Sequence, residues 1–272
     1  INPKHIDVRL KLVRILQSQG ELDQAIAEYE GLIRAAPNNP QFVFDQCDAL
    51  LQRGDKMRAQ KLLAELEARA QADEEALSRL ADYYGRLGDN EKSLRVLTKL
   101  TQVASNDAGH LVDLGDRYFQ DGNKAMALQT WNRILSSVQP RSRALSTLAD
   151  VYLEHDMSQE ALVALREAIE LDRDNASTKK QLGGALERLR NYKEAVTVWT
   201  ELGKVAAKSG DKLLAREVRS HLVTLWSLER SLDAQIPTLS ARFSAAPPDL
   251  EAGRLLAEVA LRLRKTADAE AT

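Results

Sequence analysis

Apolar positions along this chain recur in pairs of helical segments, and the pairs repeat every 34 residues. In the clearest pair, Leu111, Leu114 and Tyr118 follow one another at spacings of three and four, and this pattern ends at Gly122. A second helical pattern then begins and includes Ala127. Spacings of three and four place side chains on one face of a helix. The sequence therefore predicts amphipathic helices joined in pairs by a short turn.

Several kinds of position keep their phase over six successive repeats. Glycine stands at the turn in four of them: Gly20, Gly54, Gly88 and Gly122. A small residue follows in the second helix: Ala25, Ala59, Ser93, Ala127, Ala161 and Ala195. A bulky residue comes four positions later: Tyr29, Leu63, Leu97, Trp131, Leu165 and Trp199. Small residues let two helices approach closely and large ones fill the space beside them, so we expect both tryptophans in the core.

The boundaries of each repeat carry turn and cap residues. The six repeats span 6–39, 40–73, 74–107, 108–141, 142–175 and 176–209. Glycine at the fifteenth position adopts the left-handed conformation that ends a helix, and the next residue is an N-cap candidate: Asp55, Asp89, Asn123 and Asn191. The last position of a repeat is expected to cap the following helix: Asn39, Asp73, Asp107 and Asn175. The result is a repeated helix-turn-helix hairpin.

The order of leucine, small residue, large aromatic, glycine, alanine, bulky residue and proline resembles the tetratricopeptide repeat. That resemblance implies an all-α solenoid of 34-residue hairpins stacked into a right-handed superhelix with a concave groove. It covers residues 1–209 in strict register and the remainder loosely. Repeats five and six depart from it at Asp156 and Arg190, where the family prefers glycine.

The register breaks once, before residue 231. Residues 231–249 align without gaps to residues 21–39, an offset of 210, which is six residues more than six periods. We expect the extra length in the first helix of an irregular seventh repeat at 210–249, over about Asp211 to Glu229. Pro237 removes a backbone donor and is expected to kink the second helix. Residues 250–272 then form a truncated eighth repeat, the first residues look like the tail of an upstream repeat, and the chain is expected to be a piece of a longer protein.

Composition excludes few functions. The formal net charge of -2 and the pI near 6.2 give no reason to expect nucleic acid or an anionic membrane as partner. The single Cys47 excludes an internal disulfide and a cysteine metal cluster. No apolar run reaches the roughly 18 residues that suggest a membrane-spanning helix. The compartment is not fixed by the sequence, which slightly favours the cytoplasm.

No catalytic or cofactor motif is present in the sequence. The histidines stand in different repeats, and only Glu217 and His221 have metal-ligand spacing, which is more often that of a surface contact: His5, His110, His155 and His221. There is no glycine-rich phosphate loop and no nucleophile elbow. Gly183 and Gly184 lie within a helical pattern, where packing explains them. We therefore expect a protein that is not an enzyme and has no cofactor and no metal.

One column suggests a binding surface. The ninth position of the first helix is charged in five repeats: Arg14, Asp48, Asp82, Asp116 and Asp150. In the family that this chain resembles, the second, fifth, ninth and twelfth or thirteenth positions line the groove, which adds Phe44, Leu51, Arg86, Val112, Phe119 and Leu153. The aspartates are either soluble residues duplicated with the repeat or an acidic track for a basic peptide anchored by Phe44 and Phe119. Exposed ion pairs contribute roughly 0.2 to 1 kcal/mol each, whereas micromolar binding needs about 8 kcal/mol. The aromatic residues would therefore supply much of the affinity.

Three functions remain open at this point. The first is a non-enzymatic scaffold that binds a peptide or protein segment in the groove. The second is a structural module that associates with itself. The third is a regulatory or targeting arm of a larger enzyme or of a secretion or assembly complex. A clamp for a chaperone's C-terminal carboxylate is disfavoured, because no first helix combines the lysine and asparagine that such family members use.

Overall fold

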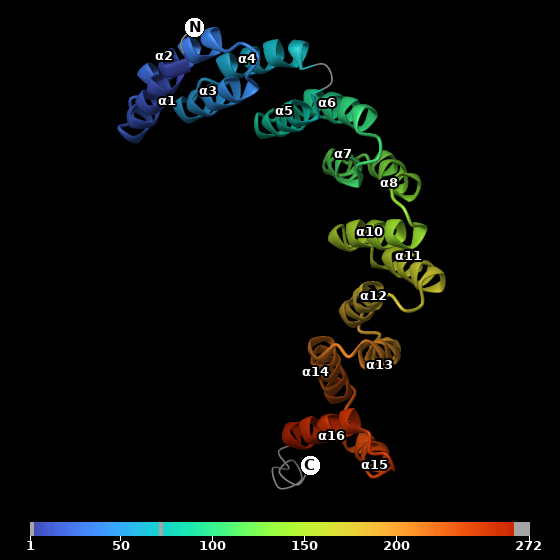
Figure 1. The fold of residues 1–272 in the computed structure, drawn as a ribbon. Coiled ribbons are helices and arrows are strands. Elements are labelled where there is room, and N and C mark those ends of the chain that lie inside the picture. Colours follow the sequence, from blue (N-terminus) through green and yellow to red (C-terminus); the bar gives the residue numbers. More distant parts are fainter. Residues whose placement is uncertain (1–2, 71–72, 264–272) are drawn as a thin grey trace. The chain divides into compact units, whose positions relative to one another are not determined.

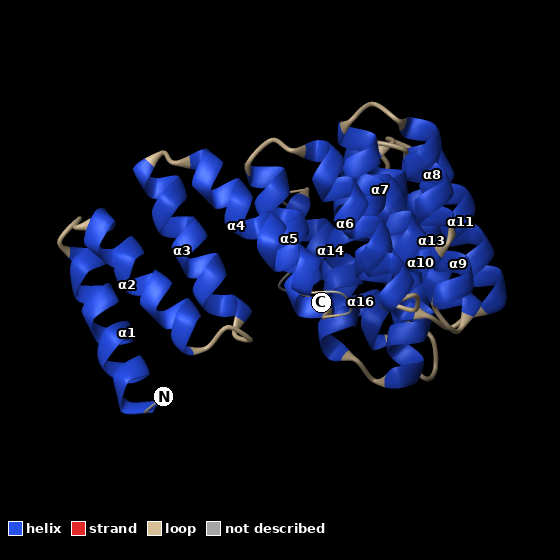
Figure 2. Ribbon diagram, turned by 90° about the horizontal axis from the view of Figure 1, so that it is seen from above, coloured by secondary structure: helices blue, strands red, loops and turns tan. Residues whose placement is uncertain are grey.

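The computed structural model describes residues 3–70 and 73–263, and every regular element in these ranges is a helix (Figures 1 and 2). The all-α fold class is thereby confirmed. None of the described helices combines the length and hydrophobicity needed to cross a bilayer. The helices group into two compact halves, an N-terminal half of residues 1–133 and a C-terminal half of residues 134–272.

The N-terminal half contains four helix hairpins that correspond to repeats one to four. Each odd-numbered helix is the first helix of a hairpin and packs against the even-numbered helix that follows it. The helices are α1 Pro3–Ser18, α2 Leu22–Ala35, α3 Pro40–Arg53, α4 Lys56–Arg69, α5 Glu74–Arg86, α6 Asn90–Val103, α7 Ala108–Gln120 and α8 Lys124–Asn132.

The C-terminal half begins with a short helix and continues with two regular hairpins, α10 with α11 and α12 with α13. The helices are α9 Ile134–Ser137, α10 Arg141–Glu154, α11 Ser158–Leu171, α12 Ala176–Arg188, α13 Tyr192–Ser209, α14 Lys212–Leu228, α15 Leu232–Phe243 and α16 Leu250–Arg262. Pro237 lies inside α15, which packs mainly on α16 and contacts α14 less. Residues 264–272, the end of the expected eighth repeat, are outside the described part of the chain.

The register break is spread over two helices rather than one. α13 has 18 residues, whereas α11 has 14. α14 has 17 residues, whereas α12 has 13. The sequence analysis assigned the extra length to α14 alone, and that assignment is incomplete. The physical reason is that nothing between Glu201 and Ser209 ends a helix; α13 stops only where Gly210 takes a φ of +71° and Asp211 caps α14.

Seven of the eight predicted cap residues accept a backbone N–H of their helix, and Asn191 does not. The side chains of Asn39, Asp73, Asp107 and Asn175 each accept a backbone N–H of the following helix. Those of Asp55, Asp89 and Asn123 do the same after the turn.

 Asp89, for example, accepts the N–H of Lys92 at 3.2 Å. Asn191 makes no such bond, and its amide instead donates to Glu194 at 2.8 Å. The caps fix where each helix begins, and so they set which residues of the first helices share a face.

Two tryptophans fill matching places in the two halves. Trp131 packs on Gly115 of α7, and Trp199 packs on Gly183 of α12; a Cβ at either glycine would collide with the indole. Both indoles are fully buried, which confirms their expected core position. Trp226 is also buried. Glycine is required at 115 and 183 because the large ring needs the space of the missing side chain.

Candidate functional site

The first helices of the N-terminal half carry most of the residues expected to line the groove. Asp48 on α3 is half-exposed and pairs with Arg86 on α5 at 3.2 Å. The Arg86 guanidinium also lies 4.8 Å from the centre of the Tyr83 ring. The charge of Asp48 is therefore paired with an arginine of the next repeat. Arg14 on α1 is exposed, and Leu51 on α3 is half-buried.

Phe44 is not available as an exposed anchor, which corrects the sequence analysis. Its side chain is fully buried in the folded chain. The ring stacks on Tyr83 with 5.2 Å between centroids, and the Arg79 guanidinium lies 4.0 Å from its centre. Tyr83 also donates its hydroxyl to the Phe44 carbonyl oxygen at 3.2 Å. The next repeat covers the fifth position of α3, so this aromatic side chain joins two repeats.

An acidic cavity of about 250 Å³ lies between α5 and α7. Three carboxylates line it, those of Asp82, Asp113 and Asp116. Burial is the main cause that raises the pKa of Asp113; the charge of His110 lowers it, and that of Asp116 raises it further. The other polar lining residues are Ser78, Ser93, Arg117 and Gln120. The cavity therefore concentrates negative charge on one face of the N-terminal half.

Neighbouring side chains hold the α7 wall of this cavity in place. Asp116 accepts a hydrogen bond from the indole N–H of Trp131 at 3.2 Å. The guanidinium of Arg117 lies on Gly85 of α5, where a Cβ would collide with it. Phe119 is half-buried, with its ring 5.7 Å from Trp131 and tilted against it. Val112, one turn earlier on the same helix, is also half-buried.

Asp150 stands in the C-terminal half and has a different environment. Its carboxylate oxygens accept the amide of Gln181 at 2.8 and 2.7 Å. Burial raises the pKa of this carboxyl, and the Gln181 hydrogen bond lowers it. Leu153 on the same helix is half-buried. The four aspartates of the ninth column are thus not equivalent: one is paired with arginine, one is bonded to an amide, and two border the acidic cavity.

The sixth position of the first helix also contributes to this surface, although it was not among the predicted site residues. Arg79 and Gln181 occupy it in repeats three and six, and each contacts the first helix of the preceding repeat. Asp113 occupies it in repeat four and shares the acidic cavity with Asp82 of repeat three. The residue type at this position was visible in the sequence: Gln181 brings an amide to the ninth-position aspartate of the preceding repeat, and Asp113 brings a second carboxylate. Arg79 instead lies on Phe44, and the cation beside Asp48 comes from Arg86.

Glu217 and His221, the pair with metal-ligand spacing in the sequence, contact different neighbours. Glu217 pairs with Lys180 at 2.7 Å. The His221 ring stacks on Trp199 with 3.8 Å between centroids, and its Nδ1 lies 2.8 Å from the Glu187 carboxylate. These contacts explain His221 as part of the packing between repeats.

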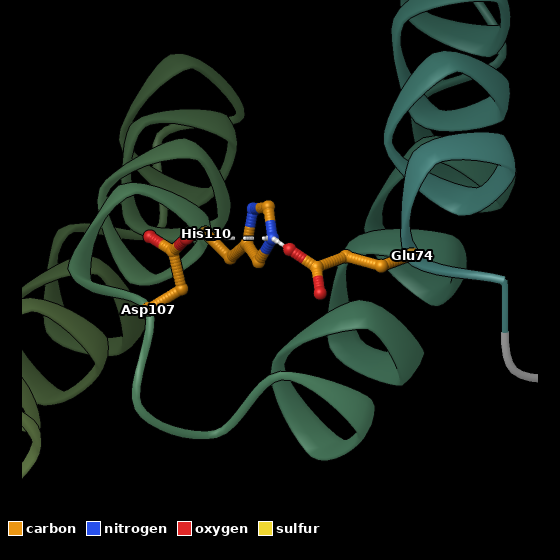
Figure 3. A group of neighbouring side chains, drawn as sticks. All are labelled: Glu74, Asp107 and His110. Carbon is orange, nitrogen blue, oxygen red and sulfur yellow. Dashed lines mark hydrogen bonds and ion pairs between the residues drawn. The ribbon is translucent and has the colours of Figure 1, made fainter.

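A different histidine lies beside two carboxylates at the N-terminal ends of α5 and α7. Nε2 of His110 is 3.0 Å from Oε1 of Glu74 and 3.9 Å from Oδ2 of Asp107 (Figure 3). The His110 side chain is 13% exposed, whereas the two carboxylates are about half exposed. The sequence analysis noted this histidine but did not connect it with the two acids.

Comparisons with known proteins agree with the helix hairpins. Profiles described as tetratricopeptide repeat match residues 1–43 and 142–175. No curated protein matches the sequence. Among solved structures, the C-terminal part of a TPR repeat-containing protein from Cytophaga hutchinsonii is similar at 14% identity and a TM-score of 0.48, covering 90% of this chain and 98% of that one. MamA 41-end from Desulfovibrio magneticus RS-1 is similar at 19% identity and a TM-score of 0.38, covering 64% and 98%. The TPR2AB domain of yeast Sti1, in a complex with pHSP90, is similar at 15% identity and a TM-score of 0.35, covering 82% and 99%.

Proposed function

We propose that this chain, which belongs to the tetratricopeptide repeat family, is a non-enzymatic scaffold that binds a basic segment of a partner protein on the first helices of its N-terminal half. The repeat architecture supports the general role, because stacked hairpins present extended surfaces and proteins of this kind are used for protein–protein interaction. The finer proposal concerns which surface binds and what it recognises.

The acidic cavity between α5 and α7 is the observation that carries this proposal. Asp82, Asp113 and Asp116 line one space of about 250 Å³, with Arg117 as the cationic residue of the lining. Carboxylates that share a space repel one another, and a cation placed among them removes that repulsion. A lysine or arginine side chain of a partner supplies such a cation together with an apolar stem that fills the opening.

The magnitudes require apolar contacts as well. Exposed ion pairs contribute roughly 0.2 to 1 kcal/mol each, while micromolar affinity needs about 8 kcal/mol. Phe119 and Val112 are half-buried apolar residues on α7, the helix that carries Asp113 and Asp116. We therefore propose that the partner segment places a basic side chain in the cavity and an apolar side chain beside Phe119.

The test uses a library of short labelled peptides in which each lysine or arginine has a matched glutamine version. We expect the basic versions to bind and the Asp82→Asn, Asp113→Asn double variant to lose roughly tenfold in affinity, with a weaker salt dependence. Asp150→Asn is the control for each single substitution, Asp82→Asn and Asp113→Asn, since it removes one carboxylate in the other half. Equal binding of basic and glutamine peptides, or an equal loss in the control, would contradict the proposal.

A second candidate function is self-association through α1. Val8, Leu12 and Ile15 form an apolar stripe on this helix and are 63%, 39% and 53% exposed. They occupy the third, seventh and tenth positions of their repeat. The same positions are buried in repeats two, three, five and six: Phe42, Gln46, Ala49, Ala76, Leu80, Tyr83, Ala144, Leu148, Val151, Thr178, Leu182 and Ala185. Within residues 3–70 and 73–263 this stacking face is exposed, and we propose that a second copy of the chain covers it.

Light scattering at increasing protein concentration tests this second candidate. We expect the mass of the wild-type chain to rise with concentration, and the Leu12→Glu, Ile15→Glu double variant to stay monomeric. Because both side chains are exposed, the helical signal should not change. A wild-type chain that remains monomeric at all concentrations would exclude self-association through this face.

A further inference from the structure

We propose that Glu74, Asp107 and His110 form a binding site for a transition-metal dication of the Zn²⁺ class that joins repeats three and four. One ligand atom from each residue lies within 4.8 Å of the other two. Figure 3 shows the Glu74 carboxylate reaching from the start of α5 toward the His110 ring on α7, with Asp107 at the start of the same helix. An imidazole nitrogen and two carboxylate oxygens are a donor set that suits Zn²⁺.

The geometry needs only small adjustments to hold such an ion. Zinc bonds of about 2.0 to 2.2 Å in a tetrahedral arrangement place neighbouring ligand atoms about 3.4 Å apart. His110 Nε2 lies 3.0 Å from the Glu74 oxygen and 3.9 Å from the Asp107 oxygen, so these two separations differ from that value by roughly half an ångström. The Glu74 and Asp107 oxygens lie within 4.8 Å of each other, and both side chains are about half exposed, so they have room to close on an ion. Water supplies the remaining ligand, as in zinc sites that keep an open position.

The Asp107 carboxylate can cap a helix and bind a cation at the same time. Its Oδ1 accepts the backbone N–H of Gly109 at 2.7 Å, while Oδ2 is the oxygen that faces His110. Glu74 is the first residue of α5, where the helix dipole favours an ionised carboxylate. Both carboxylates therefore start from helix ends that lie beside the ring.

The repeats themselves show that the fold does not require these three residues. They occupy the first and last positions of repeat three and the third position of repeat four. At the third position, four other repeats have a buried residue that is not a histidine: Phe42, Ala76, Ala144 and Thr178. Across the six regular repeats, no other junction combines an imidazole with two carboxylates at these positions. Packing alone therefore does not explain the set.

The surrounding charge favours a dication. Asp73 and Glu75 flank Glu74 in sequence, and Asp113 lies one turn after His110 on α7. A bound dication offsets the repulsion among the carboxylates and ties the start of α5 to the start of α7.

The decisive experiment measures Zn²⁺ binding to the whole chain by competition with a chromophoric chelator. We expect one site that is weakened at least tenfold in each of three conservative variants: His110→Asn, Glu74→Gln and Asp107→Asn. Asparagine at 107 keeps the helix cap, because its carbonyl oxygen accepts the same N–H. Glu75→Gln is the matched control, since it removes the neighbouring charge and leaves all three ligands. Its affinity for Zn²⁺ should equal that of the wild type.

Two further readouts separate a metal site from a simple ion pair. Co²⁺ should give visible absorption bands in the wild type that disappear in His110→Asn. Zn²⁺ at ten times its Kd should raise the Tm by roughly 3 to 6 °C, whereas Mg²⁺ should not. The proposal is overturned if Zn²⁺ affinity is the same in the wild type and His110→Asn, or if Glu75→Gln weakens binding as much as Glu74→Gln. Either outcome would show that the three side chains form only a hydrogen-bonded contact.

Discussion

The turns within the hairpins have one backbone conformation in both halves of the molecule but different residues. In the N-terminal half all four are glycine, with φ between +77° and +91°: Gly20, Gly54, Gly88 and Gly122. In the C-terminal half three turns with φ near +57° carry side chains: Asp156, Arg190 and Arg230. Arg230 follows Arg190 by 40 residues rather than 34, so the six extra residues lie between these two turns.

This difference shows that hairpin packing, rather than the turn residue, imposes the left-handed conformation. The left-handed conformation destabilises a residue with a Cβ by roughly 1 to 2 kcal/mol, and glycine lacks this strain. The C-terminal half adopts the same turn without glycine, so its helix contacts must offset the strain. The two halves therefore reach one geometry with different local stability, and the following substitutions test that conclusion from the largest expected effect to the smallest.

The largest effect is expected where the halves are alike. Ala127 and Ala161 occupy the same column, one in each half, and both are fully buried. Tryptophan at either position should overpack the hairpin and lower the free energy of unfolding by about 1 to 3 kcal/mol or more. Urea denaturation followed by circular dichroism measures the loss. Ala64→Trp, on the exposed side of α4, is the control and should change stability little; equal losses in all three would refute the shared register.

Exchanging the turn residues should have an intermediate effect of opposite sign in the two halves. Gly88→Arg reproduces the turn of repeat six in repeat three, where a Cβ would meet no atom within 4 Å. The change therefore isolates backbone strain, and we expect a loss of about 1 kcal/mol. Arg190→Gly should stabilise the C-terminal half by up to about 1 kcal/mol, reduced by the entropy that glycine adds to the unfolded chain.

The same denaturation measurement applies to both turn variants, and the double variant provides the control. Since the two turns lie in separate halves, their effects should add. A loss in Arg190→Gly would contradict the interpretation, because it would show that the arginine side chain stabilises its turn by more than the backbone strain costs.

The smallest effect concerns two partly desolvated carboxyls, those of Asp113 and Asp150, one in each half. Burial raises the pKa of Asp113 and of Asp150 in the folded chain. A raised pKa means that the folded state holds the proton more tightly than the unfolded state, so the ionised group opposes folding at neutral pH. This cost disappears as the pH falls through the folded pKa toward the unfolded value. Asp150→Asn should therefore be slightly more stable than the wild type at pH 7, and the difference should vanish near pH 3.

Unfolding measurements of Asp113→Asn and Asp150→Asn at both pH values check this sign. Asp82→Asn is the comparison, since it removes a carboxylate from the opposite wall of the cavity that Asp113 lines. A gain in stability that grows on acidification would contradict the assigned cause.

The sequence predicted the parts of this structure that a single repeat determines. Apolar spacing predicted the hairpins, and short-range chemistry predicted the caps at Asn39, Asp73, Asp107 and Asn175. The 34-residue period also placed the left-handed turn at Asp156 and Arg190, although neither is glycine. These features depend on residues within a few positions of one another, so the local pattern contains them.

Contacts between repeats were not predicted as well. Phe44 was expected at the surface, but its exposure depends on how Arg79 and Tyr83 of the next repeat lie against it. The acidic cavity likewise depends on Asp113 facing Asp82 across two helices. Such contacts are set by the rotation between neighbouring hairpins, and the pattern of one repeat does not contain that angle. The candidate site was therefore predicted as a column, whereas the structure shows a local cluster.

The matching Gly–Trp contacts give each half its own fluorescent reporter. Trp131 is the tryptophan of the N-terminal half, and Trp199 and Trp226 belong to the C-terminal half. In a chain with Trp199→Phe and Trp226→Phe, emission comes from the N-terminal half alone; in Trp131→Phe it comes from the C-terminal half alone. Comparing the two emission curves with the helical signal reveals whether the halves unfold in one cooperative step or in sequence. Fluorescence thus measures how strongly the stability of one half depends on the folding of the other.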